Sequence, residues 1–171
     1  MRNFVRLGFM ILVLSLTAVA ADYPKGEFFG GYQYSHLEGG INANGFEFAL
    51  SGNVNRWFGV TGDIGSAYWK DNGISLDTYT YTFGPKFSFR TKERYTPFAH
   101  VLIGGFHDTA ALNSVNSSID GFATLLGGGV DFKVAPRIAV RMPQFDWFLA
   151  HQGGSTSSKN VRLSFGVVVG F

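Results

Sequence analysis

The 171-residue sequence contains no cysteine, and only 15% of its residues are charged. Without cysteine, a disulfide framework, a thiolate metal site and a cysteine nucleophile are all excluded. The charged fraction lies well below the roughly 25% of ordinary soluble domains. Beyond residue 21, no apolar run approaches the roughly 18 residues that a transmembrane helix requires. The chain is therefore long enough for one domain, and that domain is not a helical membrane protein.

Glycine and aromatic residues are abundant instead. The chain has 23 Gly and 18 Phe, and aromatic residues make up 16% of it. Glycine weakens helices and aromatic side chains favour strands, so the composition fits poorly with a helical bundle. The aromatic content also excludes intrinsic disorder. The composition therefore predicts an ordered domain that is rich in β-strands.

The first 21 residues have the pattern of a cleaved secretory signal peptide. Arg2 and Arg6 precede the apolar run Leu7–Ala21, in which Ala18-Val19-Ala20 fits a cleavage site and the next tripeptide fits as well. The run is shorter than the roughly 20 residues of a membrane anchor, so we favour cleavage. Cleavage lowers the count of Lys and Arg from 14 to 12, which equals the 12 Asp and Glu. A near-neutral mature chain without a basic motif does not indicate nucleic-acid binding.

Apolar residues alternate with polar or small ones along the mature chain, residues 22–171. In the segment 161–171 every odd position is apolar, and every even position is polar or small except Val168. A period of two places the two sets on opposite faces of a strand. The same pattern predicts eight strands: 26–35, 44–55, 57–69, 78–90, 95–106, 121–134, 138–149 and 160–171.

These strands predict an all-β fold, an eight-stranded antiparallel up-and-down transmembrane β-barrel. Connections at 36–43, 70–77, 107–120 and 150–159 are longer than those at 55–56, 91–94 and 135–137, as in bacterial outer-membrane barrels. A closed barrel pairs every backbone N–H and C=O, as lipid requires, whereas a soluble sandwich would not need the aromatic girdles expected here. Those girdles are Trp57, Phe89 and Phe171 on the short-turn side, and Tyr32, Tyr34, Tyr68, Tyr79, Tyr81 and Trp147 on the other.

Two segments require a choice of face. Between Pro97 and Phe106 either parity is apolar. We place Ala99, Val101 and Ile103 outward, because the alternative exposes His100 to lipid. In 138–149 the apolar parity changes at Pro143, which predicts a β-bulge there, since one inserted residue reverses the register.

Charged and polar residues collect on the inward face. The predicted lumen residues are Glu27, Glu47, Asp63, Lys86, His100, Asp131, Lys133, Arg141, Gln144, Asp146 and Arg162. An unpaired charge in so narrow an interior costs several kcal/mol, so we interpret them as salt bridges that fill the barrel rather than as an ion pathway. Arg141 and Arg162 are the expected cations, with Glu47, Asp63 and Asp146 as candidate partners.

A resemblance to a known family rests on the signal peptide, the last strand ending in Phe171, and Gly127–Phe132 followed by Arg141–Trp147. With these features, residues 22–171 resemble the small eight-stranded outer-membrane barrels, the OmpA-like, OmpX-like and opacity-type porin family. The resemblance implies a location in the bacterial outer membrane, among lipid and lipopolysaccharide. It also implies that Phe171 is the signal read by the barrel assembly machinery.

Three functions remain open at this point. The leading one is a non-enzymatic barrel with a structural, envelope-integrity role or small-solute permeability. The alternatives are surface recognition or adhesion through the long loops, and a lipid A-modifying enzyme. For an enzyme, His151 with Ser155 and His36 with Ser35 are the candidates, but neither pair has the compact arrangement of a nucleophile and its base.

No cofactor and no metal site are expected. The histidines predicted for external loops, His36, His107 and His151, are interpreted as solvated side chains rather than metal ligands. Gly127-Gly128-Gly129 lacks the Lys-Ser/Thr of a phosphate loop, and we interpret it as a site of strand curvature or close packing.

Overall fold

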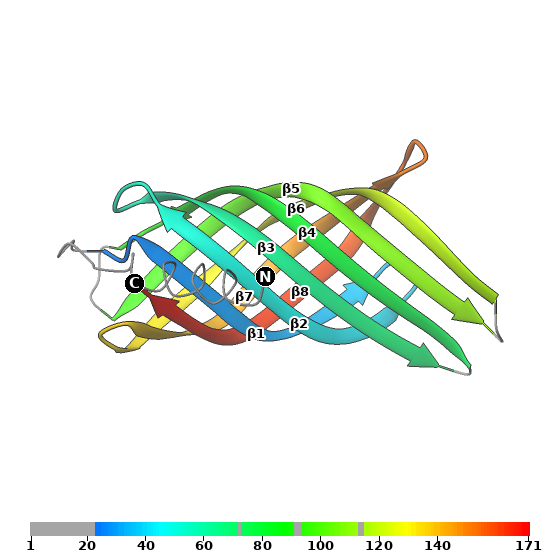
Figure 1. The fold of residues 1–171 in the computed structure, drawn as a ribbon, viewed down its shortest axis with the longest axis horizontal. Helices are drawn as coiled ribbons and strands as arrows, with labels where there is room; N and C mark the ends of the chain where they lie inside the picture. Colours follow the sequence, from blue (N-terminus) through cyan, green and yellow to red (C-terminus); the bar gives the residue numbers. More distant parts are fainter. Residues whose placement is uncertain (1–22, 72, 91–93, 113–114) are drawn as a thin grey trace, which may run out of the picture.

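The computed structural model describes residues 23–71, 73–90, 94–112 and 115–171, and the predicted signal peptide lies outside them. The strands are β1 (Gly26–Leu37), β2 (Ile41–Asn53), β3 (Phe58–Asp71), β4 (Ile74–Ser88), β5 (Tyr95–Leu112), β6 (Val115–Ala135), β7 (Ile138–Gln152) and β8 (Ser155–Gly170). They form a closed, antiparallel barrel in sequence order (Figure 1). No helix within the described ranges has the length and hydrophobicity needed to cross a bilayer. The predicted fold class is confirmed.

Strand β8 closes the barrel by pairing with β1. The pairing runs from Glu27 opposite Gly170 to His36 opposite Val161. It continues past the strand end, where Gly26 and Phe171 exchange two backbone hydrogen bonds of 2.9 Å. The start of β1 and the end of β8 therefore lie at the same end of the barrel, which we call the terminal end. The hairpins β3–β4, β5–β6 and β7–β8 turn at the opposite, distal end (Figure 1).

The outer surface of the barrel is apolar. Phe48, Ile64 and Phe83, on three neighbouring strands, are each more than half exposed. Exposed aromatic residues mark both ends of this surface, with Trp57 and Phe89 towards the terminal end and Tyr32, Tyr68, Tyr79, Tyr81 and Trp147 towards the distal end. The separation of Tyr79 on β4 from Phe89, which directly follows that strand, is close to the roughly 9–11 residues with which a tilted strand crosses a bilayer. Such a surface is stable only in lipid, so the barrel spans a membrane.

Both predicted choices of face are confirmed. Ala99, Val101 and Ile103 are exposed, and His100 is buried. In β7 the pairing with β8 shifts register between Arg141 and Gln144, on either side of Pro143. Met142 before the bulge and Phe145 after it both face outward.

The prediction of four long loops is wrong. Strands continue through most of those segments, and β5 and β6 extend to Leu112 and Val115. The connections at the distal end are short, with glycines at positive φ at 39, 40, 73, 153 and 154. Glycine adopts this backbone conformation without a steric penalty, so tight turns suffice. The distal ends of these hairpins extend beyond the lipid, where a strand needs no apolar face. Their sequences therefore lack the alternation that predicts a strand.

The barrel interior contains apolar layers as well as charges. Towards the terminal end, Phe29 packs with Ala49 and Val168. Towards the distal end lies a second cluster of Leu102, Phe106, Ala123, Leu125 and Phe148, which we call the apolar plug. Both clusters depart from the expectation of a lumen filled by small and charged residues. The polar side chains around Arg162 lie between the two clusters.

Candidate functional site

The polar interior of the barrel is the candidate functional site. The structure places eight predicted residues inside it, each in an ion pair: Glu27, Glu47, Asp63, Lys86, Asp131, Arg141, Asp146 and Arg162. All eight are buried. Lys133 is the exception among the predicted lumen residues, because it is exposed near the β6–β7 turn. The register of β6 shifts between Lys133 and Ala135, where the strict alternation of faces ends.

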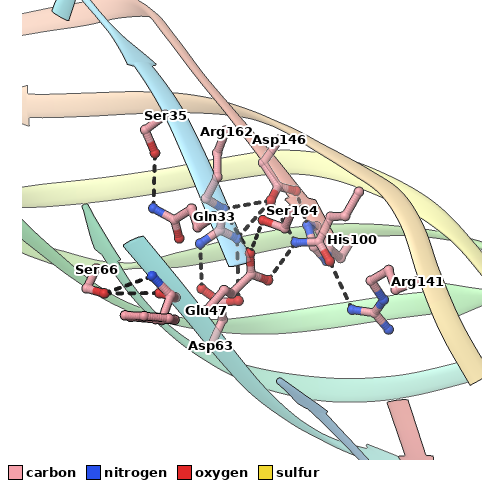
Figure 2. Close-up of polar contacts among 12 residues, drawn as sticks. Gln33, Ser35, Glu47, Asp63, Ser66, His100, Arg141, Asp146, Arg162 and Ser164 are labelled. Carbon is pink, nitrogen blue, oxygen red and sulfur yellow. Dashed lines mark hydrogen bonds and ion pairs between the residues drawn. The ribbon is translucent and has the colours of Figure 1, made fainter. Parts of the chain in front are cut away.

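Arg162 on β8 is the centre of the largest group. Its Nη1 donates to Asp63 Oδ1 on β3 at 2.8 Å, and its Nε donates to Asp146 Oδ2 on β7, also at 2.8 Å. Glu47 on β2 lies further away, with Oε2 at 3.6 Å from Nε. Figure 2 shows these side chains converging from different strands across the lumen. One guanidinium thus contacts carboxylates from three other strands, which are far apart in sequence.

Neutral and imidazole groups complete the hydrogen bonding of these carboxylates. Gln144 donates through Nε2 to both Glu47 Oε1 and Asp146 Oδ2 at 2.8 Å. The Ser164 hydroxyl donates to Glu47 Oε2. His100 Nε2 lies 2.5 Å from Asp146 Oδ1. A buried charge group is tolerated only when its remaining lone pairs are satisfied in this way.

Arg141 pairs differently from the prediction. Its Nε and Nη2 contact Asp131 Oδ1 and Oδ2 at 2.7 and 3.0 Å, a bidentate pair. The reason is register, because Asp131 on β6 and Arg141 on β7 are directly paired positions. The guanidinium also lies between the rings of Phe29 and Phe98, at 4.5 and 4.2 Å from their centroids. Phe29 and Phe98 stand at positions that the alternation of the sequence assigns to the inward face. This assignment is the sequence feature from which the contacts could have been predicted.

A separate group seals the terminal end. Glu27 accepts from Lys86 Nζ at 2.7 Å and from Arg90 Nη2 at 2.5 Å. Asn53 Nδ2 also donates to Glu27, at 3.1 Å. Arg90 was not among the predicted lumen charges, although it continues the inward parity of 78–90. It follows the end of β4, where the sequence alone does not say on which side a side chain turns.

The Gly127-Gly128-Gly129 segment allows close strand packing, as interpreted. A Cβ at Gly127 would overlap Asp146, and a Cβ at Gly128 or Gly129 would overlap the backbone of a neighbouring strand. The side chain of Asp146 occupies the space that Gly127 leaves free. The glycine run therefore helps to bring Asp146 into the Arg162 group.

Neither candidate enzyme pair, His36 with Ser35 or His151 with Ser155, makes a hydrogen bond within the described residues. Ser35 faces the lumen and bonds Gln33, whereas His36 faces outward and bonds Asn42. Consecutive strand residues point to opposite faces, so this pair cannot act together. His151 contacts Thr156 at 2.8 Å rather than Ser155.

A different histidine, His107, has both an acidic and a hydroxyl neighbour. Its Nδ1 lies 2.7 Å from Asp120 Oδ1, and its Nε2 lies 3.3 Å from Thr109 Oγ1. The order of the groups resembles that of a nucleophile relay. The side chains of His107 and Asp120 are 41% and 75% exposed. Water competes for such exposed groups, so the pair is weakly held.

Among the described residues no three His, Asp or Glu side chains are grouped to hold a metal ion.

An apolar exterior around an ion-paired interior defines a small membrane-spanning β-barrel. No protein-family model and no curated protein matches the sequence. Neisserial surface protein A is similar in structure, with a TM-score of 0.70 at 13% identity, covering 85% of this chain and 96% of that one. Ail, the attachment invasion locus protein of Yersinia pestis, has a TM-score of 0.63 at 17% identity, covering 87% of this chain and 99% of that one. The N-terminal barrel domain of Pseudomonas aeruginosa OprF has a TM-score of 0.58 at 10% identity, covering 88% of this chain and 100% of that one. The chain has the fold of the small eight-stranded outer-membrane barrels.

Removal of the Arg162 charge tests how strongly the interior depends on this residue. In Arg162→Met, Asp63, Asp146 and Glu47 lose their shared cation. We expect a loss of about 3–5 kcal/mol in the free energy of unfolding, because uncompensated charges remain buried. Denaturant unfolding of the refolded protein, followed by tryptophan fluorescence, measures it.

Lys133→Met is the matched control for this variant, because Lys133 is exposed. We expect a change of at most about 0.5 kcal/mol in that variant. The double variant Asp63→Asn/Arg162→Met buries one carboxylate fewer than Arg162→Met does. It should therefore recover part of the lost free energy of unfolding. Equal stability of Arg162→Met and Lys133→Met would contradict the role of Arg162 as the shared cation of the buried carboxylates.

Proposed function

We propose that this chain is an integral barrel of the bacterial outer membrane with a sealed lumen and a structural role in the integrity of the envelope, without catalysis. The filled interior supports this proposal most directly. Leu102, Ala123 and Leu125 in the apolar plug have at most 1% of their surface exposed. Glu47, Gln144 and Asp146 in the polar layer are fully buried. A route for small solutes needs a continuous wet path, which such packing does not favour.

The surroundings of the barrel follow from its surface. Outer-membrane lipid and lipopolysaccharide would cover the apolar belt, and the terminal end would face the periplasm. Export would use the predicted signal peptide at residues 1–21, and assembly would use the barrel assembly machinery. Likeness to NspA, Ail and OprF in fold supports this location. No nucleic-acid partner is proposed.

Single-channel recording tests the sealed lumen. We expect no steady current when the purified protein is inserted into a planar bilayer, because the apolar plug and the charge network leave no continuous water path. A heat-shift gel on the same sample checks that the barrel has formed. Steady openings of reproducible size from a folded sample would contradict the sealed lumen and favour solute permeability.

The proposed assembly signal at Phe171 needs a test that leaves the barrel seam intact. Deletion of Phe171 would also remove its two backbone hydrogen bonds with Gly26, so a substitution is more informative. We expect Phe171→Ala to lower the outer-membrane yield several-fold and to leave the protein in the periplasm. Phe171→Tyr, which keeps an aromatic ring, should assemble normally.

Refolding in detergent separates assembly from stability in this experiment. Phe171→Ala should refold in detergent as efficiently as the unaltered chain, because no assembly machinery takes part. Normal outer-membrane yield of Phe171→Ala would count against the assembly signal. A refolding defect in detergent would assign the effect to the packing of the ring against Gly26 instead.

Surface recognition is the second candidate, and the length of the β5–β6 hairpin favours it. β5 and β6 have 18 and 21 residues, and the hairpin projects at the distal end (Figure 1). One solved structure describes Ail in complex with a heparin analogue. The distal segments of this chain are acidic instead, with Glu38, Asp71, Asp77, Asp108 and Asp120 against Lys70 and Lys159. They favour a neutral or cationic partner over a polyanion.

A shortened hairpin tests surface recognition. Deletion of His107–Asp120 would cut into both strands, so the change should be made nearer the tip. Residues 110–117 replaced by Asn-Gly would join Thr109 and Ser118, which are paired positions. We expect the barrel to fold, as judged by its heat shift, and binding to host cells or matrix to be lost. Unchanged binding by the folded variant would exclude the hairpin tip.

A further inference from the structure

The distal mouth of the barrel contains a cup above the apolar plug. Its volume is about 250 Å³. Phe106 and Phe148, whose rings pack edge to face 6.1 Å apart, form the floor together with Leu37. Thr78 and Asp108 belong to the wall. The cup therefore combines an apolar base with polar sides, which is the usual composition of a small-molecule site.

Two polar atoms in this wall, Thr78 Oγ1 and Asp108 Oδ1, face each other with few other partners. Thr78 Oγ1 and Asp108 Oδ1 are buried, and neither has a hydrogen bond of normal geometry within the described residues. Thr78 is only 5% exposed, and it lies directly opposite Asp108 in the pairing of β4 with β5. A buried polar atom without a partner costs about 1–3 kcal/mol. The Thr78 hydroxyl has a single proton, which it can direct to Asp108, so an added donor could occupy the lone pairs that both oxygens retain.

The charges around the cup indicate the sign of that donor. Asp108 and Glu38 line it, and its lining includes no Lys, Arg or His. The Glu38 carboxylate accepts from the Ser157 hydroxyl, which holds it at the rim. Burial raises the pKa of Asp108 above its ordinary value, and the opposing effects of the Thr78 hydroxyl and of His107 do not cancel that rise. A bound cation would offset that desolvation, whereas an anion would add to it.

We propose that the cup binds a small organic cation. An ammonium group would donate to Asp108 and Thr78, and an attached apolar group would lie on Phe106 and Phe148. The apolar plug below would stop the ligand at the mouth, so the site would bind rather than conduct.

Benzylammonium is a suitable probe, with neutral benzyl alcohol as its isosteric control. The full protein in lipid nanodiscs is titrated while backbone amide shifts of β4 and β5 are followed by NMR. We expect saturable shifts near Thr78 and Asp108 with benzylammonium and no saturable shifts with benzyl alcohol. Asp108→Asn should raise the dissociation constant about tenfold or more, the usual scale for losing a hydrogen bond to a charged group.

Asp120→Asn is the matched control, since it removes a carboxylate from the same end but outside the cup. It should leave benzylammonium binding unchanged. Thr78→Val keeps the shape of the wall and should weaken binding less than Asp108→Asn. It provides a second measurement if Asp108→Asn fails the heat-shift test for folding.

Three results would overturn the proposal: no saturable shifts with benzylammonium, equal affinity for benzyl alcohol, or unchanged binding in folded Asp108→Asn and Thr78→Val. The test does not depend on the proposed structural role. A conducting barrel could still bind the cation, and a silent one could fail to bind it.

Discussion

The pairing of every backbone N–H and C=O within lipid is the constraint on which the rest of this structure depends. A sheet in hydrocarbon cannot leave an edge unpaired, so β8 must close on β1. Closure with eight strands fixes a narrow interior. It also sends one set of alternate side chains into lipid and the other into the lumen. The apolar exterior and the dense interior are thus two consequences of one requirement.

The narrow interior dictates how its charges are arranged. Carboxylates on β2, β3 and β7 meet a single guanidinium, that of Arg162 on β8, and Gln144 and Ser164 satisfy the remaining lone pairs. Arg141 finds its own carboxylate on the neighbouring strand and packs between two phenylalanine rings. Apolar layers on both sides exclude water from these groups. Buried pairs of this kind contribute less to net stability than to the uniqueness of the packing, because their desolvation offsets much of the attraction.

The two ends of the barrel differ in a way that bears on function. At the terminal end Lys86 and Arg90 hold Glu27, and Phe171 lies against Gly26, so this end is closed by its own side chains. At the distal end the strands continue beyond the aromatic girdle, and a cup lined by Thr78 and Asp108 opens above the plug. The proposed structural role rests on the middle of the barrel. Any ligand or partner would meet the distal end, where the acidic residues lie.

The sequence by itself determined the strand number, the lipid-facing parity, the outward face of 99–103 and the bulge at Pro143, because a period of two is a local property of the chain. It also identified the charges of the interior other than Arg90. It named Glu47, Asp63 and Asp146 as candidate partners, but only the tertiary structure decided which cation they meet, since all three contact Arg162, whereas Arg141 meets Asp131 through register. The same holds for the apolar plug, the long hairpins and the outward position of Lys133. These features depend on strand tilt, register shifts and cross-barrel distances, which no local pattern encodes.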